Sequence, residues 1–152
     1  MLHLAASRDL IDVLPSKHVV GDNQGPLTEP ADVLLLGKLR EQAIDAQLAP
    51  RVEPFHFCAV IEASPDRAAG AYLAGLLHVL PKAIDRPLLI RRPGAILPSF
   101  DEAWILGMVS AMRRDDAASL RFAIASRVER PFRRPLAFII RGLADRLDEI
   151  AE

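Results

Sequence analysis

The chain has 152 residues, of which 51% are hydrophobic and 26% charged, and its formal net charge is −1. This composition excludes a disordered chain, which would need low hydrophobicity and high net charge, and it fits a single globular domain over residues 1–152. The near-neutral total also argues against a general attraction to nucleic acid or anionic membranes, although a local basic patch is still compatible with it.

The first part of the chain is expected to be poor in regular structure. Residues 1–29 are predicted to form an N-terminal arm and loop, because turn-forming Gly, Asp, Asn and Pro residues crowd the stretch after residue 16. A helix is then predicted over residues 30–48. Pro30 suits the first helical position, and Asp32 places a carboxylate near the positive end of the helix dipole. Pro50 ends this helix.

The next segment is ambiguous, and the one after it is clear. Apolar residues in 55–61 alternate as in a strand, but they also fit helical spacing. Ser64 followed by Pro65 predicts a helix over 65–81, because Ser accepts a hydrogen bond from a free amide at the helix start and Pro lacks only a donor that is not needed there. Residues 68–80 carry no charge, so this helix should be buried nearly all round.

Two further helices are predicted after a short strand near 87–91. Ser99 and Glu102 have the spacing of a capping box, which predicts a helix over 100–113. Asp115 or Asp116 caps the next helix, predicted over 116–129.

The last helix is predicted over 135–150, after Pro135. Its apolar residues are spaced 4, 3, 4, 3, which is typical of a helix face that packs in a bundle. They are Leu136, Ile140, Leu143, Leu147 and Ile150. The predicted fold class is therefore mainly α, a compact bundle of about five helices with one or two short strands. The alternative is an α+β fold, in which strands near 55–61 and 87–91 pair beside the buried helix.

Cysteine content and hydropathy bear on the cellular compartment. Cys58 is the only cysteine, so no intrachain disulfide can form, and a reducing compartment is the simplest location. The N-terminal apolar residues are interrupted by charges at Arg8 and Asp9, unlike a signal peptide. The longest uncharged run, 68–81, is shorter than the ~20 residues that span a bilayer. We expect a cytoplasmic protein without a membrane span.

Charge divides the chain unevenly. Residues 86–146 contain twelve Arg and six acidic residues, about +6, whereas residues 1–85 contain seven basic and eleven acidic residues, about −4. Pro131 and Pro135 are expected to interrupt the helix and leave an exposed, Arg-rich corner. The side chains proposed to bind an acidic protein partner or a small anion are Arg127, Arg130, Arg133, Arg134 and Arg141. Alternatively, these Arg residues form a solvated face that is paired with acids of the N-terminal half.

No catalytic motif occurs in the sequence, so an enzyme is the weaker class, and no cofactor or metal is predicted. Cys58 lies among apolar residues that would keep its thiol protonated and inert. A second hypothesis is a small-molecule-binding protein or enzyme with a pocket between buried helices. Its lining residues would be Tyr72, His78, Arg92 and Trp104.

The favoured hypothesis is a small interaction or regulatory module that self-associates into a homo-oligomer. The charge split and an excess of apolar helix for one small domain both favour it. Weak nucleic-acid binding is the third hypothesis, and it is disfavoured because only Phe132 and Phe138 offer rings for base stacking beside the basic residues.

Overall fold

The computed structural model describes residues 11–14 (backbone only), 27–48 and 64–152, and these residues form a mainly α fold, as predicted. The helices are α1 (Pro30–Leu48), α3 (Pro65–Ala83), α4 (Phe100–Arg113), α5 (Ala117–Arg127) and α6 (Arg130–Ala151). The strands are β1 (Ile11–Leu14) and β2 (Leu88–Arg91).

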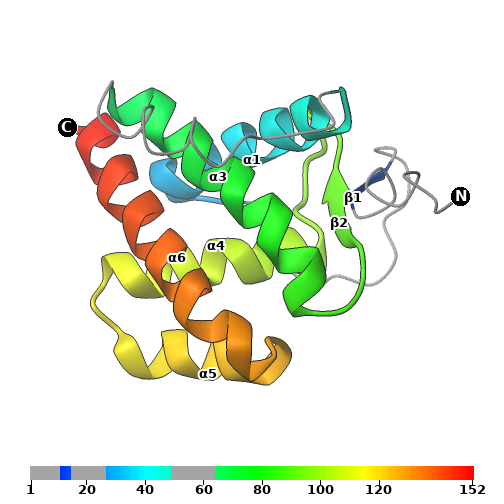
Figure 1. Ribbon diagram of the computed structural model, residues 1–152. Helices are drawn as coiled ribbons and strands as arrows, with labels where there is room; N and C mark the ends of the chain where they lie inside the picture. The colour runs from blue at the N-terminus through cyan, green and yellow to red at the C-terminus, as the bar shows by residue number, and fades with distance from the viewer. Residues whose placement is uncertain (1–10, 15–26, 49–63) are drawn as a thin grey trace, which may run out of the picture.

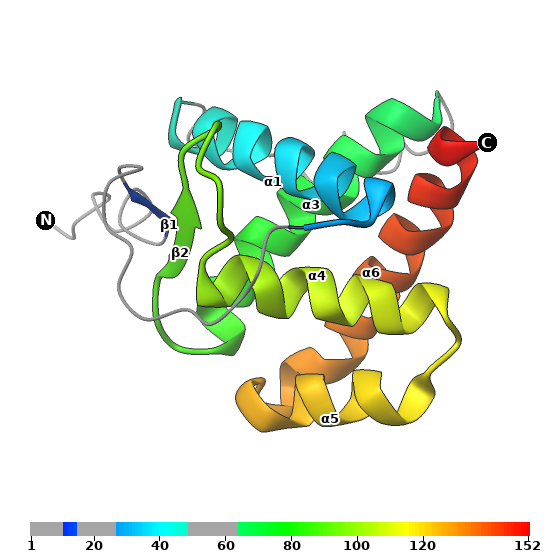
Figure 2. The ribbon, with the colours of Figure 1, turned by 180° about the vertical axis from the view of Figure 1, so that it is seen from behind.

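The helices pack around one core, with α3 and α6 forming the most extensive helix–helix contact (Figure 1). Helix α4 lies behind α6 and also contacts α5, which closes the lower side of the molecule. The two strands lie at one end, next to α1 and the start of α4, away from α5 (Figure 2). None of the helices in the described part of the chain is long and apolar enough to cross a bilayer.

Three of the predicted helix starts, those of α3, α4 and α5, are confirmed by their caps. The Ser64 hydroxyl accepts a hydrogen bond from the Arg67 amide at 3.2 Å. Ser99 and Glu102 form the complete capping box at the start of α4, with the Glu102 amide 3.1 Å from Ser99 Oγ. The Asp116 carboxylate caps α5 through the Ser119 amide at 3.0 Å. Each side chain satisfies an amide that has no partner inside its helix.

The apolar patterns of α3 and α6 form the centre of the core. Within the uncharged stretch 68–80, seven residues are buried, five are half-buried and His78 is exposed, so the prediction of a helix buried nearly all round is confirmed only in part. The predicted apolar seam of α6 is confirmed, with Ile150 half-buried and the other four members buried. The largest fully buried side chains are Leu35, Leu39, Leu73, Leu76, Leu80, Leu88, Ile90, Ile105, Met108, Leu136, Ile140 and Leu143.

The contact between α3 and α6 depends on a glycine. Tyr72 of α3 is buried with its ring directly against the backbone of Gly142 in α6. A Cβ atom at position 142 would lie 2.2 Å from the ring carbon Cζ of Tyr72, far inside the ordinary carbon–carbon separation. The absence of a side chain at Gly142 therefore sets how closely the two helices approach.

The predicted start of the last helix was wrong. Helix α6 begins at Arg130, and it contains both Pro131 and Pro135. Pro131 lies in the first turn, where its missing amide donor is not needed. Pro135 removes one hydrogen bond, and burial of Leu136 and the apolar residues that follow it outweighs that loss. No exposed break separates 130–134 from the rest of the helix, and the helix predicted to end at 129 ends at Arg127.

The strand predicted near 87–91 is confirmed as β2, and its partner comes from the N-terminal arm. Residues 11–14 form β1, parallel to β2, with Ile11 opposite Leu88 and Leu14 opposite Arg91. The sequence did not predict β1, because four residues are too short a pattern to distinguish a strand from a turn. The ambiguous segment 55–61 lies outside the described residues.

Candidate functional site

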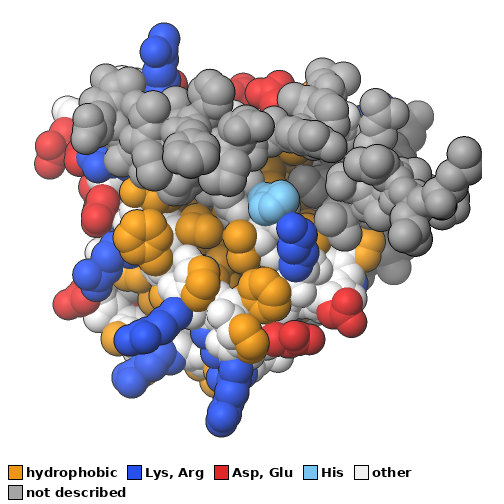
Figure 3. Space-filling model, in the orientation of Figure 1, with side chains coloured by type: hydrophobic (Ala, Val, Ile, Leu, Met, Phe, Trp, Pro, Cys, Tyr) orange, Lys and Arg blue, Asp and Glu red, His pale blue; other side chains and the backbone are white. Residues whose placement is uncertain are grey.

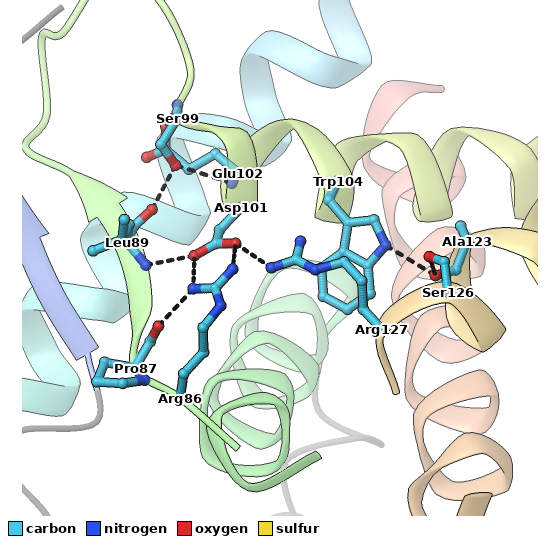
Figure 4. A network of polar contacts seen from close by, with 10 residues as sticks. All are labelled: Arg86, Pro87, Leu89, Ser99, Asp101, Glu102, Trp104, Ala123, Ser126 and Arg127. Atoms are coloured by element: carbon cyan, nitrogen blue, oxygen red, sulfur yellow. Dashed lines mark hydrogen bonds and ion pairs between the residues drawn. The ribbon is translucent and has the colours of Figure 1, made fainter. Parts of the chain in front are cut away.

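The start of α4 holds a buried network of charged side chains (Figure 4). Asp101 is 1% exposed and accepts hydrogen bonds from both terminal nitrogens of Arg86, at 2.9 and 2.6 Å. It also accepts from Arg127 Nη2 at 2.6 Å and from the Leu89 amide of β2 at 2.8 Å. One carboxylate thus joins α4, α5, β2 and the turn after α3.

Glu102 performs a parallel role one residue later. Its carboxylate accepts from Arg40 Nε of α1 at 2.9 Å and from Arg40 Nη2 at 3.1 Å. It also accepts from the Arg91 amide at 2.8 Å and from the Ser99 amide at 2.7 Å. Ser99 Oγ in turn donates to the Leu89 carbonyl. The polar groups at the open edge of β2 are therefore satisfied by side chains of α4, where a larger sheet would place another strand.

The contacts of this network indicate a structural role. Burial alone would raise the pKa of Asp101, but the hydrogen bonds from Arg86, Arg127 and Leu89 outweigh it and hold the pKa below its usual value. The carboxylate is thus charged at neutral pH and fully occupied by protein donors. It has no remaining capacity to act on a ligand.

Two of the predicted binding cations are engaged inside the protein. Arg127 pairs with Asp101, and its guanidinium stacks 4.3 Å from the centre of the Trp104 ring and 5.0 Å from that of Phe100. Arg133 Nε donates to the Val128 carbonyl at 2.9 Å, which closes the end of α5. These two residues support the fold and do not form a free cationic surface.

The other three predicted cations are free. Within the described part of the chain, Arg130, Arg134 and Arg141 are exposed and their guanidinium groups have no hydrogen-bond or ion-pair partner. Phe138 lies between them on the same side of α6, with 64% of its surface exposed. We call these four residues the basic α6 surface. In Figure 3, several Lys and Arg side chains project at the lower left edge, near α5 and α6.

An open groove of about 320 Å³ lies beside the basic α6 surface, between the end of α4, the start of α5 and α6. Its lining is mostly apolar and includes two members of the surface itself, Phe138 and Arg141. The lining residues are Ala111, Met112, Asp115, Asp116, Ala117, Leu120, Ala137, Phe138 and Arg141. The groove can hold apolar side chains while the neighbouring guanidinium groups donate hydrogen bonds to carboxylates.

The charges of α6 oppose the dipole of their own helix. Arg130, Arg133 and Arg134 occupy the first turns, where the positive end of the dipole disfavours cations, and Glu129 at the N-cap makes no side-chain capping bond. The last turn has no basic residue and carries Asp148 and Glu149. Each misplaced charge costs ~0.3–1 kcal/mol, so the stability of the isolated helix does not explain the pattern.

The four residues of the predicted pocket are not brought together. Tyr72 is buried against Gly142, and Arg92 is exposed just after β2. Trp104 donates its ring N–H to the Ala123 carbonyl at 3.1 Å and packs on Arg127. His78, which was predicted to line the same pocket, is exposed on α3.

Among the described residues, the polar neighbour of His78 is Lys82, one turn later on α3. The Nε2 atom of His78 lies 3.0 Å from Lys82 Nζ. Partial burial and, secondarily, the Lys82 charge lower its pKa. Among the described residues, no group of three or more His, Cys, Asp or Glu side chains is arranged to hold a metal ion.

The sequence predicts the three free cations among its binding residues, but it does not predict the apolar groove next to them. The sequence indicates Phe138 only as a stacking ring for nucleic acid, and it does not predict the groove beside this residue. Its signal was present, because Phe138 falls between Arg134 and Arg141 at helical spacing. The partners of Asp101 and Glu102 were not predictable, because they come from segments up to 62 residues away.

Comparison with known proteins provides no further assignment. No protein-family model matches the chain, and neither a curated protein nor a solved structure is similar to it.

Proposed function

We propose that this chain is a protein-interaction module whose basic α6 surface binds an acidic, partly apolar segment of a protein partner. The single observation that carries the proposal is a set of three guanidinium groups, those of Arg130, Arg134 and Arg141, which have no partner among the described residues and lie on the same side of α6 as the exposed Phe138. Guanidinium groups favour carboxylates because their planar donors match the two carboxylate oxygens.

The surroundings of these cations favour a peptide-like ligand over an isolated anion. The groove beside Phe138 is lined mainly by apolar side chains, which a small inorganic anion would leave unused. A segment that alternates acidic and apolar side chains can use both the guanidinium groups and the groove. The unfavourable placement of Arg130 and Arg134 at the start of α6 is then compensated when the partner's carboxylates bind.

A peptide-binding measurement tests this proposal. The probe is a fluorescein-labelled helical peptide in which pairs of Glu alternate with pairs of Leu. Its fluorescence anisotropy is measured as the full chain is added, at two salt concentrations. We expect binding that weakens at high salt, and at least tenfold weaker binding by the variant R134Q/R141Q, because each charge-assisted hydrogen bond contributes ~1.5–3 kcal/mol.

The matched control removes the same charge elsewhere. The variant R67Q/R92Q also loses two exposed guanidinium groups, and it should bind within about twofold of the original chain. Equal weakening by both variants would show that only net charge matters and would reject the proposed site. Tighter, Arg134-dependent binding of a single-stranded oligonucleotide than of the peptide would replace the proposal with nucleic-acid binding.

A further inference from the structure

The exposed side of α6 has a charge order that is complementary to itself. Residues on this side recur at spacings of 4, 3, 4 and 3, as the buried seam does on the opposite side, and they form a line along the helix. We call this line the outer stripe. Its members are Arg134, Phe138, Arg141, Asp145 and Asp148.

We propose that the partner held by the basic α6 surface is the acidic half of α6 from a second copy of this chain, in an antiparallel pair. The inference rests on the proposed function and names its ligand. The stripe runs from cations at Arg134 and Arg141 to anions at Asp145 and Asp148, so an antiparallel copy places opposite charges side by side. A parallel copy would place like charges together.

Twofold symmetry fixes which residues meet. With the axis between Phe138 and Arg141, each residue faces the one at the same distance on the other side of the axis. Arg134 then lies opposite Asp145 of the second copy, and Asp145 opposite its Arg134. The two residues are eleven positions apart, about 16 Å along the helix, so the two pairs lie well separated on either side of the axis. Phe138 and Arg141 of opposite copies meet at the centre, where a guanidinium can stack on a ring.

The lack of ion pairs at Arg134 and Asp145 within the described part of one chain supports the pairing. Asp145 is exposed and makes no ion pair inside the described part of its own chain, as is true of Arg134. By contrast, Asp148 is already bound by Arg113 at 2.7 Å, so we assign the main contact to Asp145. Both charges required for the symmetric pair are thus free of ion pairs within the described part of the chain.

The antiparallel arrangement also accounts for the unusual placement of charge along α6. The basic first turns of one helix would lie beside the negative C-terminal end of the other helix, where cations are favoured. An unfavourable feature of the single chain becomes favourable in the pair. One helix face is a small interface, below ~1,200 Å², so we expect a weak, salt-sensitive dimer.

Sedimentation of the full-length protein tests the dimer through a charge exchange. At low salt and rising protein concentration, the original chain should approach twice the monomer mass. Arg134→Glu or Asp145→Arg alone places like charges together and should raise the dissociation constant at least tenfold, which corresponds to ~1.4 kcal/mol. The combined variant R134E/D145R restores opposite charges and should restore dimerisation. Because both side chains are exposed, thermal melting of each single variant should remain close to that of the original chain.

The control is Arg92→Glu, an equal change of charge at an exposed site outside α6, which should leave the dimer intact. The proposed dimer is overturned if the original chain is a monomer at all concentrations. It is also overturned if neither single variant weakens dimerisation, or if the combined variant R134E/D145R does not restore it. If the chain is monomeric yet the Glu–Leu peptide binds in an Arg134-dependent way, the proposed function stands and only the second copy is rejected. If neither the dimer nor the peptide complex forms, both proposals fail.

Discussion

Adding one methyl group at Gly142 is the sharpest test of how α3 and α6 pack. In Gly142→Ala, the new Cβ would lie 2.2 Å from Cζ, 2.3 Å from Cε1 and 2.7 Å from Oη of Tyr72. Carbon atoms in contact prefer ~3.5 Å or more, so the buried ring or one helix must move by about 1.3 Å. Forcing extra volume into a packed core typically costs ~1–3 kcal/mol.

Gly107→Ala provides a matched control on α4. Gly107 is also inside a helix, but it is exposed and a Cβ there would meet nothing within 4 Å. Both substitutions gain up to ~1 kcal/mol of helix propensity, so the difference between the two variants isolates the packing cost.

We expect Gly107→Ala to raise the free energy of unfolding and Gly142→Ala to lower it, with a difference of about 1–3 kcal/mol. Urea unfolding followed by circular dichroism measures both values. In the Gly142→Ala background, Tyr72→Leu should recover part of the loss, because the shorter side chain vacates the space near the new Cβ. Equal stabilisation by both glycine substitutions would refute the described contact between α3 and α6.

Three further predictions follow from particular contacts. Pro135→Ala should stabilise the protein by about 1–3 kcal/mol in thermal melts, because alanine can donate the helix hydrogen bond that Pro135 cannot. Unchanged or lower stability would argue against a continuous α6 at this position. Asp101→Asn should cost about 3 kcal/mol in urea at pH 7, because it removes the charge that Arg86 and Arg127 face. Because the pKa of Asp101 is lower in the folded state, its ionised form stabilises the fold above the unfolded-state pKa, and this contribution is lost as the pH falls below about 4. The difference in unfolding free energy between the original chain and Asp101→Asn should therefore become smaller in acid. Arg127→Ala should increase acrylamide quenching of Trp104, the only tryptophan, and unchanged quenching would contradict the stacked geometry.

The helices were predictable because their signals are local. Ser64, the Ser99–Glu102 pair and Asp116 act on amides within three residues, so their spacing in the sequence already describes their bonds. The seam of α6 was similarly visible in its 4, 3, 4, 3 spacing. The error at Pro135 arose from applying a local rule, that proline ends helices, where burial of the following residues outweighs it.

The long-range features were not predictable from one sequence. Strand β1 exists only through its pairing with β2, some 77 positions later, and four residues carry too little pattern to indicate it. The roles of Arg127 and Arg133 depend on which carbonyls and carboxylates tertiary packing brings near them. Sequence therefore identified a basic segment, and the structure separated the engaged cations from the free ones.

The most direct test of the central claim, that the free cations of α6 contact carboxylates, is a ¹⁵N NMR titration with the Glu–Leu peptide. The account predicts that the guanidinium Nε signals of Arg130, Arg134 and Arg141 shift, together with backbone amides lining the groove, while the Nε signal of Arg92 stays fixed. Shifts centred on Arg92 and β2, or no saturable shift in residues 130–141, would contradict it.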